Sequence, residues 1–228
     1  MAAGTGDPPA GRRPAGRLID LLTRTGHGRQ AVAELLQLAS DPAADSAARR
    51  QAGEMLLERG GAREAADVFG GLTNEHPHDG DLWNDLGNAQ FAAGDFDAAR
   101  GAYSKALRWS SNDRSALVHR LAVTNTVIAL DPTGVHLSAS ARNRRSRDLV
   151  SRVLTVLERC GGGPDHLAGG AATVAEAARR ELSQSRREEG DTPHALALVQ
   201  QLWTHAQPLC LGQQPDEAAA ALVAKLAK

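Results

Sequence analysis

Polar side chains that could bind a peptide recur within residues 80–113. Asn84 and Asn88 stand four residues apart, so a helix would carry both amides on one face, one turn apart. Each amide offers two donors and an acceptor, which suits an extended peptide backbone. Both residues are poorer helix formers than Glu or Lys, which favours a binding role. The alternative is that they belong to the solvated face of an amphipathic helix.

The densest cluster of charge is a run of four arginines: Arg142, Arg144, Arg145 and Arg147. They fall at the start of an expected helix, where positive charge opposes the helix dipole. This position favours a contact patch for an acidic partner or for phosphate groups, and the alternative is a solvated helix start. No aromatic side chains interleave with the arginines to stack on bases, so nucleic acid is not an expected partner.

No set of residues has the pattern of a catalytic or metal site. His76 and His78 flank a single residue, but no further ligands stand at metal-binding spacing. Serine, histidine and aspartate occur in no nucleophile motif. The glycines at 161–163 do not follow a strand, so they are not a phosphate cradle. We therefore expect no enzyme activity, no cofactor and no metal.

Composition favours an all-α fold. Apolar residues make up 42% of the 228 residues but aromatics only 3%, so small side chains must carry much of the packing. Closely approaching helices tolerate this better than a β-sandwich, which needs β-branched and aromatic residues. The net charge of -1 conceals a division, because residues 46–113 hold 7 basic and 11 acidic side chains and residues 114–160 hold 8 and 3. Neither part has the uniformly basic face of a nucleic-acid binder.

The sequence also bears on the cellular compartment of the protein. Cys160 and Cys210 stand at no metal or redox spacing, so we expect a reducing compartment and a cytoplasmic location. No apolar run approaches the roughly 20 residues that a membrane span needs, so we expect no membrane partner. The first residues lack the apolar core of a secretory signal, and we interpret 1–14 as a disordered leader.

Two helical hairpins repeat one pattern at a distance of 34 residues. Each consists of two short amphipathic stretches joined by a turn that contains glycine, and a proline or polar turn ends the first. Five matched positions at one period are hard to obtain by chance. The matched pairs are Gly53 and Gly87, Gly60 and Gly94, Ala65 and Ala99, Phe69 and Tyr103, and Leu72 and Ala106.

This pattern resembles the tetratricopeptide repeat. Residues 80–113 carry its signature as Trp83-x2-Leu86-Gly87, then Gly94-Asp95, Ala99, Tyr103 and Ala106. The resemblance is good over 46–79, although Arg49 stands where the tryptophan would be, and weak over 12–45. It implies an all-α, right-handed solenoid of four to five helical hairpins that ends in a capping helix.

The resemblance also implies a concave groove lined by the first helix of each unit. The implied groove positions are Arg50, Gln51, Glu54, Glu58, Asp81, Asn84, Asp85, Asn88, Phe91, Ser115, His119, Ala122, Asn125 and Thr126. Some members clamp a C-terminal carboxylate, and here the corresponding positions hold Arg50, Glu54, Asp85, Ser115 and His119. One arginine and two acids cannot neutralise a carboxylate well, so a basic or neutral peptide is the expected partner.

The expected organisation is an array over 15–160, then a flexible linker at 161–172 and a degenerate hairpin with a terminal helix at 173–228. The units of the array fall at 12–45, 46–79, 80–113 and 114–160, with an insert at 131–142. The expected function is a non-catalytic adaptor that binds a protein or peptide segment in the groove. Two alternatives remain: a regulatory or enzyme-accessory protein that uses the arginine-rich insert, and a self-associating scaffold with homo-oligomers.

Overall fold

The computed structural model describes residues 25, 27–41, 43–111, 114–184, 192–213 and 216–227. These residues form ten α-helices, one short 3-10 helix and no strand, so the expected all-α class is confirmed. The expected leader at 1–14 and the first helix of the first hairpin, at 18–22, lie outside the described residues. The chain divides into two compact units between Val118 and His119.

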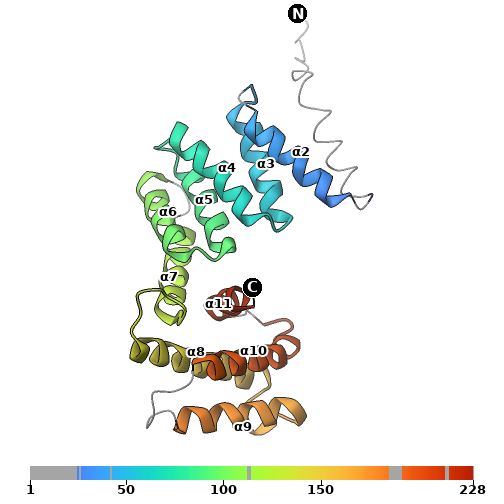
Figure 1. The fold of residues 1–228 in the computed structure, drawn as a ribbon, viewed down its shortest axis with the longest axis vertical. Helices are drawn as coiled ribbons and strands as arrows, with labels where there is room; N and C mark the ends of the chain where they lie inside the picture. The colour runs from blue at the N-terminus through green and yellow to red at the C-terminus, as the bar shows by residue number, and fades with distance from the viewer. Residues whose placement is uncertain are drawn as a thin grey trace, which may run out of the picture. The chain divides into compact units, whose positions relative to one another are not determined.

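In the first unit, each helix packs against the helix that follows it, up to α6 (Figure 1). This is the sequential pairing that the repeat predicts. The helices are α2 (Gly28–Ser40), α3 (Ser46–Glu58), α4 (Ala62–Glu75), α5 (Gly80–Ala93) and α6 (Phe96–Trp109), and α7 (Arg114–Leu130) begins in this unit.

Aspartate side chains start three of these helices. Asp45 accepts a hydrogen bond from the backbone N–H of Ala48, and Asp95 accepts one from Ala98. Such caps stabilise a helix by about 1 kcal/mol. In α5 the cap is Asp79, whose carboxylate accepts hydrogen bonds from the N–H groups of Asp81 and Leu82. Asp81 lies in the first turn, where its charge favours the helix dipole.

The core of the first unit repeats one contact between a small and a large residue. An added Cβ at Gly53 would lie 2.9 Å from the ring of Phe69, and one at Gly87 would lie 2.6 Å from the ring of Tyr103. Both rings are buried. Each hairpin therefore closes by placing an aromatic ring of its second helix directly on a glycine of its first helix. The second of these contacts repeats the first one 34 residues later in the chain.

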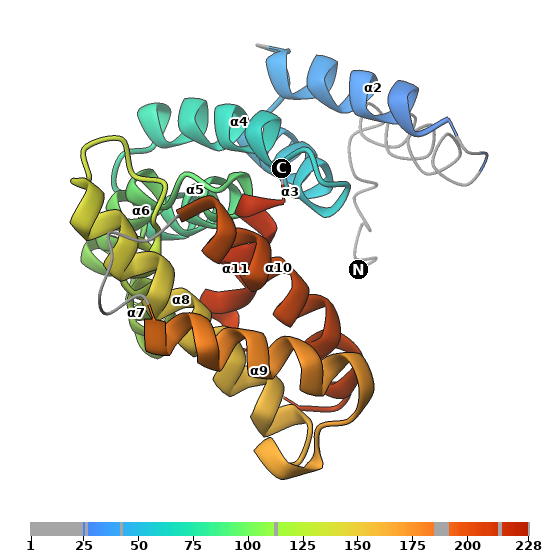
Figure 2. The same ribbon diagram turned by 60° about the horizontal axis from the view of Figure 1, so that its bottom comes forward.

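In the second unit, α8, α9 and α10 pack against one another, and α11 lies against α8 and α10 (Figure 2). Valine and leucine side chains from these helices fill its core. The elements are α8 (Ala139–Cys160), a 3-10 helix (Pro164–His166), α9 (Gly169–Gln184), α10 (Thr192–Leu209) and α11 (Glu217–Leu226).

A disulfide joins Cys160, at the end of α8, to Cys210, just after α10. The two Cα atoms lie 4.9 Å apart and the residues are 50 positions apart in the sequence. The two cysteines stand at no metal or redox spacing in the sequence, so the sequence did not indicate this pairing. The disulfide weighs against the expected reducing compartment, because such bonds persist in oxidising surroundings.

The division of the chain differs from the expected one. The boundary falls within α7, so residues 139–160, expected in the array, pack with the C-terminal helices instead. The expected linker at 161–172 holds a turn, the 3-10 helix and the first residues of α9. Within the described residues, no helix combines the length and apolar character required to cross a membrane.

Candidate functional site

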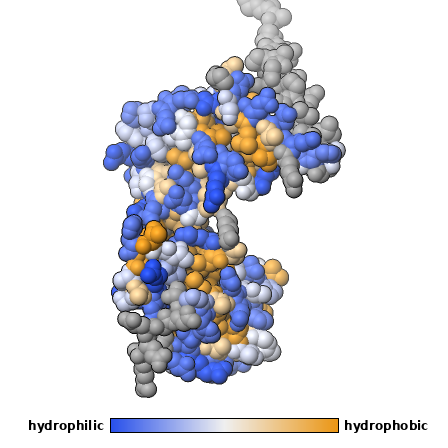
Figure 3. Space-filling view, in the orientation of Figure 1, coloured by the Kyte–Doolittle hydropathy of each residue, from blue (hydrophilic) through white to orange (hydrophobic). Residues whose placement is uncertain are grey.

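A hollow of about 310 Å³ opens in the first unit between α3 and α5, with α4 contributing to its lining. We call it the acidic hollow, because three of its six lining residues are carboxylates. On the face shown in Figure 3, apolar side chains gather near α3 and α4 within a largely hydrophilic surface. The lining residues are Glu54, Leu57, Glu58, Phe69, Asp85 and Asn88.

Arg50 lies beside the hollow and pairs with its carboxylates. Its Nη2 is 2.7 Å from Oδ2 of Asp85, and its Nε is 3.4 Å from Oε1 of Glu54. The pKa of Asp85 is raised to about 6, chiefly by burial; Arg50 opposes the increase, and the negative charges of Glu54 and Asp81 contribute to it. The hollow therefore holds its negative charge at a point where water is partly excluded.

The structure brings several of the expected groove residues together. Glu54, Glu58, Asp85 and Asn88 all line the hollow. The side-chain oxygen of Asn88 accepts a hydrogen bond from the hydroxyl of Tyr103 at 3.0 Å. The second helix of the hairpin thus fixes the orientation of Asn88, a role that the sequence did not suggest.

Other expected groove residues lie around the hollow or pack elsewhere. Gln51 and Asp81 are exposed, and Asn84 is partly buried. Phe91 packs edge to face on Phe96, with ring centroids 5.1 Å apart, at the turn between α5 and α6. The aromatic ring therefore belongs to the packing of its own hairpin.

Four expected groove residues belong to the second unit: His119, Ala122, Asn125 and Thr126. His119 places Nε2 3.1 Å from Oε2 of Glu217, at the start of α11, and Asn125 is exposed on α7. The groove that the resemblance implied across three repeats is thus divided between two compact units. The candidate site is therefore built from α3, α4 and α5 alone.

The arginine run, the alternative site, is partly occupied by contacts within the second unit. Arg145 donates from Nη1 to the carbonyls of Ile128, at 2.8 Å, and of Asp131, at 3.0 Å. Arg147 donates from Nη2 to the carbonyl of Leu182 at 3.2 Å. These carbonyls lie at the ends of α7 and α9, where backbone acceptors lack partners within the helix.

The two remaining arginines of the run occupy different environments. Arg144 is exposed, whereas Arg142 is partly buried. The run is therefore a mixture of structural and surface arginines, although it reads as one patch in the sequence.

The two histidines of the His76-x-His78 pair contact different neighbours. His76 Nε2 lies 3.0 Å from the hydroxyl of Ser46, and His78 packs edge to face on Trp109 with ring centroids 4.2 Å apart. Within the part of the chain that the structure describes, no group of three or more His, Cys, Asp or Glu could hold a metal ion.

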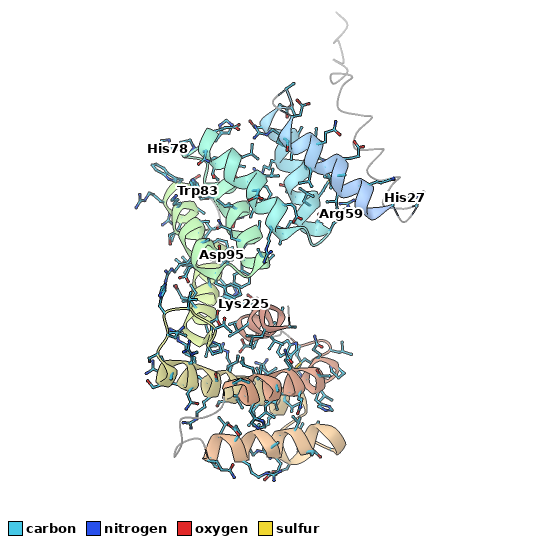
Figure 4. All side chains as sticks on the ribbon, viewed as in Figure 1. His27, Arg59, His78, Trp83, Asp95 and Lys225 are labelled. Atoms are coloured by element: carbon cyan, nitrogen blue, oxygen red, sulfur yellow. A yellow bond between two sulfur atoms is a disulfide. The ribbon has the colours of Figure 1, made fainter. Side chains whose placement is uncertain are left out.

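Sequence reasoning missed the apolar part of the site. Leu57 lines the hollow although it was not assigned to the groove, and Phe69, which the sequence matched to Tyr103 of the next repeat, lines it as well. The available signal was their spacing, since Leu57 stands between Glu54 and Glu58 in the sequence. Outside the hollow's lining, Lys105 Nζ lies 3.9 Å from the ring centroid of Trp83, which Figure 4 labels, and no sequence pattern indicated this contact.

A family model described as a tetratricopeptide repeat matches residues 56–122. The match runs from the last turn of α3 through α4, α5 and α6 into α7, and it includes all the hollow's lining residues except Glu54. No curated protein and no solved structure matches the chain.

Proposed function

Residues 56–122 form a tetratricopeptide repeat domain, and from this premise we propose that the chain is a non-catalytic adaptor. It binds a segment of another protein in the acidic hollow. Tetratricopeptide repeat domains are generally protein–protein interaction modules, which supports a role in binding another protein. The family alone does not place the binding site, because one fold supports many functions.

The observation that carries the proposal is the hollow itself. Between α3 and α5 it combines exposed carboxylates with the apolar side chains of Leu57 and Phe69. Binding sites commonly join an apolar surface to a few convergent polar groups. The arginine run has less support as the binding site, because Arg145 and Arg147 donate to backbone carbonyls within the second unit.

Site-specific photo-crosslinking tests the proposal. The photoreactive residue p-benzoylphenylalanine would replace Gln51, which is exposed on α3 one turn before Glu54 and does not itself line the hollow, in the full chain expressed in its native host. The matched control carries the same residue in place of Asp67, which is exposed on α4 and does not line the hollow. Covalent adducts would be separated on denaturing gels and identified by mass spectrometry.

A discrete adduct with one protein at position 51, and none at position 67, is the expected result. Equal labelling at both positions, or no adduct at position 51, would rule out the hollow as the binding site. Light scattering of the purified chain separates this adaptor from the self-associating scaffold, which would form homo-oligomers.

The compartment in which the adaptor works is a separate question. A cytoplasmic location, expected from the sequence, stays a prediction, and the disulfide between Cys160 and Cys210 weighs against it. Alkylation of thiols in intact cells, followed by mass spectrometry, distinguishes the two situations. Two alkylated cysteines would support the cytoplasm, and an intact disulfide would support an oxidising compartment.

A further inference from the structure

We propose that the acidic hollow receives one basic side chain, lysine or arginine, from the bound segment, with its ammonium or guanidinium group beside Glu54 and Glu58. This inference rests on the proposed function and specifies the chemistry of its partner. Three features of the first unit support it: the balance of charge, the position of the two glutamates, and the apolar lining.

The balance of charge favours a cationic guest. Glu54, Glu58 and Asp85 all line the hollow. Arg50 is the cation that pairs with them, and it lies closest to Asp85, at 2.7 Å. Arg59, the next residue after α3, turns a guanidinium nitrogen to the carbonyl of Met55 at 3.1 Å. Among the residues that the structure describes, one arginine therefore faces three carboxylates, and negative charge remains available for a guest.

The two glutamates stand where they do not favour their own helix. Glu54 and Glu58 are one turn apart on α3, a spacing at which like charges repel. Glu58 is also the last residue of α3, where a negative charge opposes the helix dipole. A bound cation would relieve both effects, so the arrangement is suited to a guest of opposite charge.

The apolar lining suits the stem of a basic side chain. Lysine and arginine bury their methylene groups on apolar surface while the charged head stays near water. Leu57 is partly exposed and provides such a surface, with the buried ring of Phe69 also in the lining, and the side chain of Glu54 is about half exposed. The hollow thus offers separate places for the stem and the charged group.

Other occupants fit less well. A C-terminal carboxylate, an acidic segment or a phosphopeptide would meet carboxylates of the same charge. A divalent cation is also disfavoured, because these carboxylates do not form a group that could hold a metal ion, within the residues that the structure describes. Asp85, whose pKa burial raises to about 6, would be further stabilised in its charged form by a nearby cation.

The test uses two nonapeptides with glycine, alanine and serine flanks that differ only in the central residue, which is arginine or citrulline. Citrulline keeps the shape of arginine but carries no charge. Each peptide is titrated into the ¹⁵N-labelled full chain, and amide chemical shifts are followed. We expect the arginine peptide to shift amides within 54–58 and 85–88 and to bind at least about fivefold more tightly than the citrulline peptide.

Matched variants check the role of the glutamates. Glu54→Gln with Glu58→Gln should remove most of the preference for arginine. The control is Glu34→Gln with Asp67→Asn, which removes the same charge from exposed positions of α2 and α4 and should leave the preference unchanged. All four positions are exposed, so the fold should tolerate each change.

The outcomes separate this inference from the proposed function. Equal binding of the two peptides, no shift at the hollow, or an unchanged preference in the double glutamine variant would overturn the basic-side-chain inference. If photo-crosslinking at position 51 still captures one protein in that case, the adaptor function stands. If position 51 captures nothing, the adaptor function fails independently of the peptide result.

Discussion

Arg50 of α3 and Asp85 of α5 form an ion pair at 2.7 Å, and this pair joins the first helices of two successive repeats. Only 14% of the Asp85 side chain is exposed. Burial outweighs the attraction to Arg50, so the pKa of Asp85 rises to about 6 from its ordinary 3.8. The same carboxylate lines the candidate binding site.

Replacing Asp85 with Asn should therefore change how stability depends on pH. A carboxyl with a raised folded-state pKa stabilises the fold below the unfolded value of 3.8, and this contribution is lost as the pH rises through about 6. Between pH 4 and pH 7, the free energy of unfolding of the parent chain should fall relative to Asp85→Asn. After solvent screening is considered, we expect a difference of about 1–2 kcal/mol.

Urea unfolding at several pH values measures this difference. Asp67→Asn, at an exposed position of α4, is the control. Its free energy of unfolding should change with pH in the same way as that of the parent chain. Parallel profiles for Asp85→Asn as well would show that burial does not raise the pKa of Asp85.

Gly87→Ala should destabilise the first unit. Its new Cβ would lie 2.6 Å from the ring of Tyr103, which is buried and cannot move freely. Overpacking of this kind costs about 1–3 kcal/mol. Gly101→Ala is the matched control, because nothing lies within 4 Å of its added Cβ on α6 and alanine favours a helix. Thermal unfolding should show a lower Tm for Gly87→Ala and an equal or higher Tm for Gly101→Ala, and equal effects would contradict the contact.

Removal of the disulfide should destabilise the second unit. The bond closes a loop of about 50 residues, and loss of such a crosslink typically costs about 2–4 kcal/mol. Trp203 lies on α10 in this unit and Trp83 lies in the first, so their indole NMR signals can follow the two units separately. In Cys160→Ser with Cys210→Ser, the Trp203 signal should be lost at a lower temperature. A reducing agent should reproduce the effect in the parent chain, and a native protein with two free thiols would refute the pairing.

Arg145→Met should destabilise the second unit more than Arg144→Met. Arg145 donates to the carbonyls of Ile128 and Asp131, and loss of such charged hydrogen bonds costs about 1.5–3 kcal/mol. Arg144 is exposed, so its replacement should change the free energy of unfolding by no more than about 0.5 kcal/mol. Chemical unfolding measures the stability of the two variants. Similar decreases in the free energy of unfolding would mean that the arginine run acts as one surface patch.

Lys225→Met should loosen α11. Lys225 Nζ lies 2.6 Å from Oδ2 of Asp131 and so holds the C-terminal helix against the end of α7 (Figure 4 labels Lys225). Burial pushes the pKa of Asp131 up, but hydrogen bonds from Lys225 and Thr133 outweigh it and hold the pKa below its usual value. The stabilisation is therefore present above about pH 4 and is lost as the pH falls through the lowered pKa.

Hydrogen exchange of the α11 amides measures this effect. At neutral pH they should exchange about tenfold faster in Lys225→Met, which corresponds to about 1.4 kcal/mol. Lys105→Met removes a lysine from the first unit and should leave α11 unchanged. Unaltered exchange in Lys225→Met would show that the apolar face of α11 alone holds it in place.

The candidate site was only partly predictable from the sequence. Glu54, Asp85 and Asn88 were expected because the first helices of successive repeats present them at regular positions. Leu57 and the ion pair from Arg50 were not, because side-chain direction and reach depend on how α3 and α5 pack. His119 and Asn125 follow the same sequence pattern as the groove, yet they lie in the second unit.

The sequence by itself determined the helical hairpins of the first unit. The contacts of Gly53 with Phe69 and of Gly87 with Tyr103 are local and recur at one spacing, so a period of 34 residues makes them visible. Only the tertiary structure decided the pairing of Cys160 with Cys210, and that of Lys225 with Asp131. These contacts join residues 50 and 94 positions apart and occur once each, so no periodicity reports them. Their existence depends on how whole helices pack, a property of the folded chain that local spacing does not contain.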